Sequence, residues 1–569
     1  MTARPALPAH RLLLGGIALM STAALMTGCA GPATTAAPVD PATQVAEAAA
    51  LAVPPEQDDP DAVAGGTLRL SSSQDPACLD GHQVSSAALQ LLGRLYYDNL
   101  VSLDATGTPT PWLAESWDIS EDGRQYTFHL KDGVTFSDGA KLDAAAVVAN
   151  FDHMADPATK SPLAAAYIDP IESTEIVDDL TLKVNLEYAY SPFLYVLAQG
   201  WLGLDSPKQI AEDPDGICLA PVGTGPFVVE EYTPGEGLTL TKREDYAWSA
   251  DYLNHEGAAY LDRIEISFVA EPAVRFSSLT SGEFDATDNI APQNAAAVKA
   301  DPAITYNNIS RIGNPQRITL NTARPPFDDL KVRQALALGI DTEGIAAAVG
   351  FGEYEPRHAF LSPTTQYYDA AAEEDWTYDP EAAAELLDEA GWDETDAEGY
   401  RVKDGTRLTA EFPVTETAAP GSLNDLIQSE LKKLGVELKL IQLPTAEATE
   451  RRRNGQYDIG TGVWHTNTPD ALYVVYASGE ITSKQRIGQN TARIADPTLD
   501  ETLLKARQTT DPAELEELYT SAQEQLAELV PAIPLYDFYT PWAVRENVHG
   551  VLADSSHGVP LFTLAWLGQ

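Results

Sequence analysis

The segment 111–151 constrains the fold of this 569-residue chain more than any other stretch. Apolar and polar residues alternate in two runs, 117–119 and 126–130, as they do in half-buried strands. The Glu-Asp-Gly sequence at 121–123 between these runs is typical of a tight turn. Asp143 then precedes an alanine- and valine-rich run, where its side chain can cap a helix. The segment therefore predicts a β-hairpin that leads into a helix.

Helices and strands alternate through the second half of the chain. Asp379, Ser422 and Asp511 each stand before a run typical of a helix, in the N-cap position. The strand-like runs 436–443 and 457–464 lie between these helices. This alternation predicts βα units with a mostly parallel sheet, and therefore an α/β fold.

Acidic residues far outnumber basic ones. The chain has 85 Asp and Glu against 36 Lys and Arg, a formal net charge of −49. Binding to nucleic acid or to an anionic membrane surface depends on clustered Lys and Arg. The composition therefore argues against both as direct partners, and it is typical of a soluble body that is exported.

The N-terminal residues 1–28 have the pattern of a bacterial export signal. Arg4 and Arg11 precede an apolar run that is too short and interrupted for a membrane span of ~20 residues. Small residues stand directly before Cys29, a pattern similar to the bacterial lipobox, which implies a lipidated cysteine. A plain secretory signal with an unrelated cysteine stays open. Residues 29–64, rich in Ala, Pro, Thr and acidic residues, predict a disordered tether.

Four motifs of the chain resemble the family 5 extracellular solute-binding proteins, the receptors of oligopeptide, dipeptide and nickel ABC importers. The segment 111–151 contains, in the family's order, a proline, L-A-x-S-W, a D-G turn, Y-T-F-x-L, G-V-x-F-x-D-G and a helix. The other motifs are PVGTGPF at 221–227, LTSGEFD at 279–285 and LNTARPPFDDLKVRQAL at 320–336. The resemblance covers about residues 65–545, nearly the whole body after the tether.

The resemblance implies an α/β clamshell of the type II, cluster C, periplasmic-binding-protein kind, with two lobes and an extra inserted domain. Ligand in the cleft between the lobes would stabilise the closed state by its differential affinity. The expected division is lobe I at 65–105, 187–290 and 535–569, extra domain II at 106–186, and lobe III at 291–534.

The resemblance also implies a function. The chain would be the substrate-binding lipoprotein of an ABC importer, a monomer that captures a small polar solute, foremost a peptide or peptide-like compound. It would lie on the outer face of the plasma membrane or in the periplasm, and would meet the permease subunits there. Two alternatives stay open: a receptor that presents its ligand to a membrane sensor, and a receptor for a nickel chelate or another non-peptide solute.

An exported hydrolase is the third class, and the sequence argues against it. The chain has no GxSxG elbow, no GxxxxGK[ST] loop and no cysteine left over for nucleophilic chemistry. The sequence therefore predicts a binding protein without catalytic residues and without a cofactor.

The predicted ligand contacts lie in one run and are Trp464, His465, Thr466, Asn467 and Asp470. In peptide-binding relatives an aspartate of this loop takes the ammonium group of the peptide. Asn467 occupies that position by residue count, and a neutral amide supplies no charge for an ammonium group. Asp470 could replace the aspartate if the loop is shifted. Trp464 could form an apolar wall of the cleft, or it could pack in the core.

Two arginines have predicted roles. Arg357, in YEPRHAF, resembles the arginine that takes a ligand carboxylate in dipeptide-binding relatives, and its planar guanidinium suits bidentate contacts. A surface or domain-closing arginine is the alternative. Arg333, in the fourth motif, is predicted to be a buried ion-pair partner.

Cysteine and histidine usage gives two further predictions. Cys78 and Cys218 remain after Cys29 is assigned to lipid, and the family motifs beside them lie near the same lobe. This placement implies a disulfide in an oxidising compartment, with two separate buried thiols as the alternative. His82, His358 and His465 have no HxH or HExxH spacing, so no free-metal site is predicted.

Overall fold

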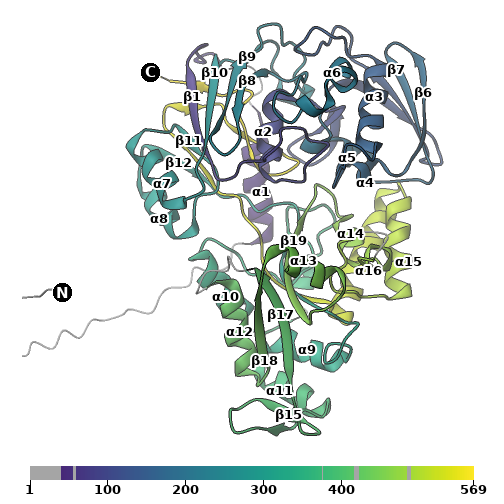
Figure 1. Cartoon of the computed structure of the whole chain (residues 1–569), viewed down its shortest axis with the longest axis vertical. Helices are drawn as coiled ribbons and strands as arrows, with labels where there is room; N and C mark the ends of the chain where they lie inside the picture. The colour runs from purple at the N-terminus through teal and green to yellow at the C-terminus, as the bar shows by residue number, and fades with distance from the viewer. Residues whose placement is uncertain (1–39, 55–58, 375, 416–421, 484–487, 569) are drawn as a thin grey trace, which may run out of the picture. The chain divides into compact units, whose positions relative to one another are not determined.

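The computed structural model describes residues 40–54, 59–374, 376–415, 422–483 and 488–568 (Figure 1). A seven-stranded sheet forms the centre of one half of the described chain. The middle strand, which comes first in sequence, is parallel to the strands on both sides of it, whereas the outer strands pair antiparallel. In spatial order the strands are β12 (Ile304–Asn307), β21 (Trp542–Arg545), β11 (Ala286–Thr287), β1 (Thr67–Ser72), β10 (Arg263–Phe268), β9 (Gly237–Lys242) and β8 (Phe227–Thr233).

The predicted hairpin is confirmed. Strands β4 (Ala114–Ile119) and β5 (Gln125–Leu130) pair antiparallel, and Tyr126, Phe128 and Leu130 are buried as their alternation predicts. Helix α3 (Ala144–Ala155) follows, and the Asp143 carboxylate accepts a hydrogen bond from the Ala146 N–H at 2.8 Å. Two later strands, β6 (Ile171–Asp178) and β7 (Thr181–Leu186), complete a four-stranded antiparallel sheet.

The prediction of a mostly parallel sheet is wrong for the other half of the chain. The sheet of β19 (Ile459–His465), β13 (Gly313–Leu320) and β20 (Ala532–Tyr536) is antiparallel throughout. The chain enters this half just before β13 and leaves it just after β20. The two strands therefore run in opposite directions. Among the described strands of this half, only β17 (Thr409–Thr415) and β18 (Glu437–Leu443) are parallel, and helix α12 (Leu423–Lys433) lies between them in sequence.

Short helices cover these sheets. Around the first sheets lie α2 (Ala88–Tyr96), α4 (Ala164–Ile168), α5 (Phe193–Leu197), α6 (Pro207–Glu212), α7 (Pro272–Ser281) and α8 (Pro292–Ala300). Around the second lie α9 (Leu330–Gly339), α10 (Thr342–Gly350), α11 (Pro380–Glu389), α13 (Thr445–Arg453), α14 (Ala471–Tyr476), α15 (Pro497–Gln508) and α16 (Pro512–Leu529). Asp379 and Asp511 cap α11 and α16 as predicted. Among the described helices, none is both long and apolar enough to cross a membrane.

Short two- and three-stranded sheets fill the remaining connections. They are β2 (Val101–Leu103) with β3 (Pro109–Pro111), β14 (Glu394–Thr395) with β15 (Arg401–Lys403) and β16 (Thr406–Arg407), β22 (Val548–His549) with β25 (Trp566–Leu567), and β23 (Leu552–Ala553) with β24 (Pro560–Leu561).

The apolar residues form two large cores. One core takes residues from 68 to 286 and from 542 to 565, and the other takes residues from 318 to 536. The chain therefore passes between the cores twice, around residues 308–312 and 537–541. Strand β12 lies within the predicted lobe III, 291–534, but it pairs with β21 in the seven-stranded sheet. The first passage thus follows β12, some 15 residues later than the predicted boundary at 291.

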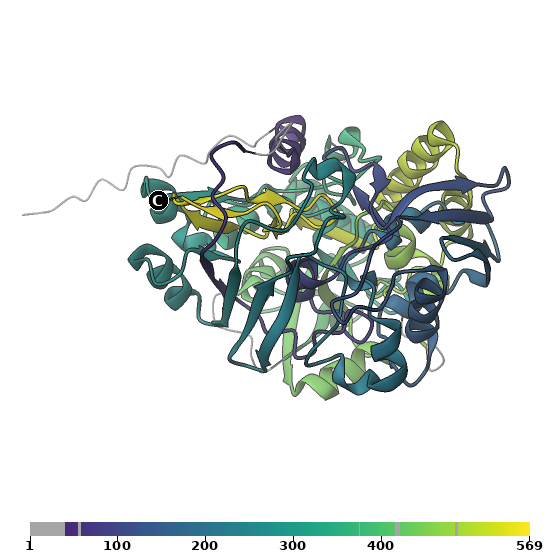
Figure 2. The same cartoon turned by 90° about the horizontal axis from the view of Figure 1, so that it is seen from above.

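The predicted tether, 29–64, is not wholly without structure. Residues Pro41–Ala52 form helix α1, which Asp40 caps by accepting a hydrogen bond from the Ala42 N–H. An N-cap aspartate, a proline at the first position and an alanine-rich run favour this helix locally. It lies beside β23 (Figures 1 and 2). Cys29 and the predicted signal lie outside the described residues.

Two more predictions concern the packing. Cys78 and Cys218 form a disulfide across 140 residues of sequence. Arg333 is buried as predicted, but it donates hydrogen bonds to the backbone carbonyls of Phe327 and Leu529 instead of forming an ion pair. The Leu529 carbonyl lies at the end of α16 and the Phe327 carbonyl lies in the loop before α9, so neither is satisfied by the hydrogen bonds of a helix. One guanidinium can donate to several such carbonyls at once.

Candidate functional site

The C-terminal end of β19 lies between the two cores. Gly313 of β13 faces His465 in the strand pairing, and Asn314 faces Trp464. The Trp464 side chain is half-buried and packs against apolar residues of both cores. Its indole N–H has no hydrogen-bond partner within the described chain. Trp464 therefore lies at the boundary between the cores, as expected for a residue that lines a cleft.

Thr466 and Asn467 connect the cores by hydrogen bonds. The Gln199 side-chain NH₂ donates to Thr466 Oγ1 and to Asn467 Oδ1, both at 3.1 Å. The Asn467 NH₂ donates to the Tyr195 carbonyl at 2.7 Å. The amide of Asn467 is thus used as both donor and acceptor, and it adds no charge at this point.

The carboxylate of Asp470 is held inside the protein. It is buried and accepts a hydrogen bond from Arg507 Nη2 at 2.9 Å. Burial raises the pKa of this carboxyl, although Arg507 opposes the shift. Asp470 therefore already has a cationic partner, and its role as a ligand contact stays a prediction.

Arg357 is also engaged within the protein. Its side chain is 5% exposed, and Nε donates to the Asp537 carboxylate at 2.8 Å. Its Nη2 donates to the side-chain carbonyl of Gln44 in helix α1. The structure thus brings Arg357 to the second chain passage, and places it in a buried ion pair with Asp537.

A cavity of about 120 Å³ opens at the carboxyl end of β1, and none of the predicted ligand contacts lines it. In α/β sheets this end of the parallel strands is the usual place of a ligand. The wall includes residues of the β1 end, of the turn after β11 and of both chain passages, namely Ser73, Gln74, Asp288, Asn289, Arg311, Phe538 and Thr540. The cavity is therefore formed by the half that contains the seven-stranded sheet and by the two chain passages.

Arg311 is the cation of this cavity. Its side chain is buried, Nη2 donates to the side-chain carbonyl of Gln90, and Nε has no partner among the described residues. Asp554, the nearby carboxylate, forms its ion pair with Arg94 at 3.3 Å instead. Burial lowers the pKa of Arg311 to about 10, so the guanidinium is charged at neutral pH. Arg311 is therefore a buried charge that lacks a direct counter-ion.

Two histidines near Arg311 are neutral. The His465 ring contacts the Phe538 ring at 4.8 Å between centroids, and His557 is almost fully buried. Burial and the charge of Arg311 keep the pKa of both imidazoles well below the usual value. The Nε2 atom of each ring has no hydrogen-bond partner in the described chain. Both rings thus offer polar atoms without adding charge.

Arg317 of β13 is a second buried guanidinium without an ion pair in the described chain. It stacks over Tyr476 at 5.9 Å, and its Nε and Nη1 have no partner. Its charge, like that of Arg311, lowers the pKa of His465. The boundary between the cores therefore has excess positive charge, in a protein that is otherwise strongly acidic.

Sequence reasoning missed Arg311, Arg317 and His557. None of them lies in a motif with recognisable spacing, and an arginine in a sequence does not reveal whether it has a partner. Only the packing shows that these polar atoms are unpaired and buried.

The chain is similar to several known proteins. The model of the family described as "Bacterial extracellular solute-binding proteins, family 5 Middle" matches residues 108–485. The glutathione-binding protein GsiB of Salmonella paratyphi A is 29% identical over 469 residues, covering 80% of this chain and 86% of that protein. Di/tripeptide-binding protein 1 of Pseudomonas aeruginosa is 28% identical over 514 residues, covering 85% of this chain and 91% of that protein.

Solved structures show the same likeness. NikA from Brucella suis, in complex with Fe(III)-EDTA, has a TM-score of 0.78 at 26% identity and covers 88% of this chain and 100% of that one. The periplasmic binding protein DppA from Helicobacter pylori, in complex with the peptide STSA, has a TM-score of 0.73 at 25% identity, with coverages of 89% and 99%.

Proposed function

Because the chain belongs to the family 5 bacterial extracellular solute-binding proteins, we propose that it is the receptor of an ABC importer for a small peptide-like solute with a carboxylate group. The fold is the two-lobed α/β clamshell of that family. The relatives are binding proteins whose names refer to glutathione and to di- and tripeptides, which supports a peptide-like solute. The receptor binds and releases this solute and makes or breaks no bond.

The observation that carries the proposal is Arg311 in the cavity beside the two chain passages. A buried charge without a partner costs free energy, and a ligand carboxylate that pairs with it removes that cost. The guanidinium of Arg311 has an Nε–H free for such a contact. Charge-assisted hydrogen bonds between guanidinium and carboxylate are among the strongest in proteins. We therefore assign the solute's carboxylate to Arg311. Trp464, at the boundary between the cores, would contact an apolar part of the solute outside this cavity.

The division of the chain into lobes follows the two cores. Lobe I contains the seven-stranded sheet including β12, the inserted domain contains the sheet of β4 to β7, and lobe III contains β13 to β20. The passages at 308–312 and 537–541 act as the hinge. The hydrogen bonds from Gln199 to Thr466 and Asn467 close the lobes on each other.

The attachment to the cell is proposed from the sequence. Cys29 carries the lipid anchor, and the chain works on the outer face of the plasma membrane or in the periplasm as a monomer. The closed lobes present the solute to the permease subunits.

A binding assay tests the proposal. Isothermal titration calorimetry with glutathione and with the dipeptide Met-Leu should show saturable binding to the purified protein, and Met-Leu with an amidated C-terminus should bind more weakly. A hundredfold excess of ligand over Kd should stabilise the fold by about 2.7 kcal/mol. Arg311→Met should abolish the preference for the free carboxylate. Arg263→Met is the matched control and should bind as the unaltered protein does, because half-buried Arg263, at the start of β10, pairs with Glu230 and Glu265 and does not line the cavity.

Equal affinity for the acid and the amide would contradict the assignment to Arg311. A second candidate solute is a metal chelate, because His465 Nε2 is unpartnered and a polycarboxylate chelator also fits a cationic cavity. Binding of Fe(III)-EDTA but of neither peptide probe would favour this class. A receptor that passes its ligand to a membrane sensor would show the same binding without uptake into cells.

A further inference from the structure

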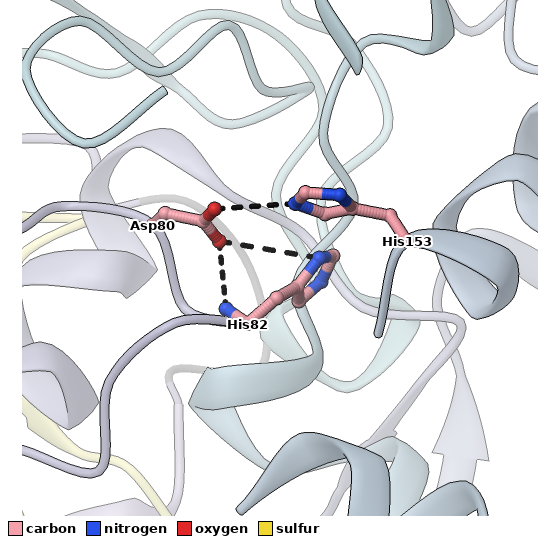
Figure 3. A group of neighbouring side chains, drawn as sticks. All are labelled: Asp80, His82 and His153. Atoms are coloured by element: carbon pink, nitrogen blue, oxygen red, sulfur yellow. Dashed lines mark hydrogen bonds and ion pairs between the residues drawn. The ribbon is translucent and has the colours of Figure 1, made fainter. Parts of the chain in front are cut away.

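Four polar side chains meet close to the disulfide, and none of them lines the cavity of Arg311. Figure 3 shows three of them: Asp80 and His82, which follow Cys78, and His153 in the last turn of α3. The fourth, Asp205, lies in the loop before α6. Asp80, His82 and Asp205 have no exposed surface, and His153 is 7% exposed. The group therefore lies in the interior, where each charge needs a partner.

The charges of this group do not balance. Asp80 and Asp205 are two buried carboxylates, and no lysine or arginine of the described chain forms an ion pair with either. The basic groups that face them are the imidazoles of His82 and His153. The two carboxylates therefore need a shared proton or a cation beside them.

Two of the polar atoms are also unpartnered. His82 donates Nε2–H to the Gly203 carbonyl at 2.9 Å, which leaves the lone pair of Nδ1 pointing into the group. This Nδ1 lies 3.6 Å from Asp205 Oδ2 and 4.0 Å from Asp80 Oδ1. Neither Nδ1 nor Asp205 Oδ2 has a hydrogen-bond partner in the described chain. Two acceptors that face each other without a hydrogen between them require a cation or a shared proton.

The spacing fits one metal ion. One ligand atom each from Asp80, His82 and His153 lies within 4.8 Å of the others, and His153 Nε2 is 3.2 Å from Asp80 Oδ2. In a tetrahedral zinc site with bonds of about 2.0–2.1 Å, neighbouring donor atoms are about 3.3 Å apart. The widest pair of donors, at up to 4.8 Å, would approach by up to about 1.5 Å when a metal ion binds.

The surrounding residues hold the donors as they do around metal ions. Two contacts orient the imidazole rings so that one nitrogen of each faces inward. His82 Nε2–H donates to the Gly203 carbonyl, and Thr159 Oγ1 lies 3.2 Å from His153 Nδ1. Tyr97 donates to Asp205 Oδ1 at 2.6 Å, so that Oδ2 stays free. Gln83 donates to Asp80 Oδ2 at 2.8 Å.

We propose that Asp80, His82, His153 and Asp205 form a buried site for one divalent metal ion of the zinc class. Two histidines and two carboxylates suit zinc, and two anionic ligands neutralise its charge. The site is structural: it joins the loop after the disulfide, helix α3 and the loop before α6. It is separate from the solute cavity and does not depend on the solute's identity.

Metal analysis of the full-length protein tests the proposal. Protein produced with zinc in the medium and then dialysed should contain one zinc per chain, released only when guanidinium chloride unfolds it. Protein unfolded in EDTA with its disulfide intact and refolded without metal should have a lower Tm, which added Zn²⁺ restores. Absence of zinc together with a Tm that Zn²⁺ does not change would overturn the proposal in favour of a shared proton.

Variants separate a metal ligand from a packing residue. Asp205→Asn keeps an acceptor for Tyr97 and can donate to His82 Nδ1, so it should fold but contain no zinc. His153→Gln, at the less buried edge, gives a second test if the first variant does not fold. His129→Gln, which removes an exposed contact to Asp118, should keep one zinc per chain. Equal zinc content in all three variants would overturn the site, whatever the solute assay shows.

Discussion

At the scale of single residues, the ion pair between Arg357 and Asp537 decides between two roles for Arg357. Asp537 has no exposed surface, and burial raises its pKa to about 7. Arg357→Met removes the partner of this carboxylate, and breaking a buried pair costs about 3–5 kcal/mol. Urea unfolding at pH 8 should show this loss, and Asp537→Asn added to the variant should recover part of it. Unchanged stability with lost affinity for Met-Leu would instead make Arg357 a ligand contact.

His557 gives a prediction of pH dependence. The unfolded chain binds a proton at His557 near pH 6.5, whereas the folded protein binds it only at a much lower pH. Below about pH 6.5 the unfolded state therefore holds more protons than the folded state does. His557 thus lowers the free energy of unfolding as the pH falls from about 6.5. Between pH 6 and 5, the free energy of unfolding of the His557→Gln variant should fall by about 1 kcal/mol less per pH unit than that of the unaltered protein. Urea unfolding at both pH values measures this difference. Parallel losses in both proteins would show that His557 is protonated in the folded state.

Residue chemistry could be predicted where it is local. Asn467 supplies no charge, because an amide is neutral in any environment, and its role as a ligand contact stays a prediction. The partner of Asp470 is Arg507, which is 37 residues away in sequence. Such pairs arise from tertiary packing, and no pattern around Asp470 indicates them.

At the scale of elements, helix α1 adds a contact to the hinge. Gln44 donates from Nε2 to the Tyr539 hydroxyl at 3.1 Å and accepts from Arg357, both near the second chain passage. Gln44→Ala removes these bonds and should lower the free energy of unfolding by about 1–2 kcal/mol. Val45→Ala, one residue on with a side chain 42% exposed, should change it little. Equal effects in thermal unfolding would show that α1 makes no specific contact.

The disulfide between Cys78 and Cys218 stabilises the loop after β1. It closes a loop of 140 residues, which stabilises the fold by up to about 5 kcal/mol on the chain-entropy model. Urea unfolding with and without reductant should show a loss of this order, together with a mass gain of two hydrogens. The loop also holds Asp80 and His82, so reduction should weaken zinc retention. A reduced protein of equal stability would contradict this role.

Elements set by local sequence could be predicted, and long-range pairings could not. The hairpin of β4 and β5 and the caps at Asp143, Asp379 and Asp511 each depend on a few adjacent residues. The antiparallel pairing of β13 with β19 and β20 depends on where the chain passes between the cores, which periodicity does not show. The metal group was missed for the same reason, because Asp80 and His153 are 73 residues apart.

At the scale of the whole molecule, the two cores and the two passages between them explain the function. A clamshell binds by closing, and a ligand shifts the population toward the closed state by as much as it prefers that state. The charge of Arg311 supplies such a preference, because its counter-ion is present only when the solute is bound. The resemblance predicted this architecture, whereas the position of the passages and the cation of the cavity required the structure.

The most direct test of this account is native mass spectrometry of the protein with glutathione and Met-Leu. The account predicts a complex of one solute per chain, from which the solute is released with its mass unchanged, and whose abundance falls strongly in the Arg311→Met variant. A protein that forms no complex with either probe, or that releases a cleaved or altered compound, would contradict the account.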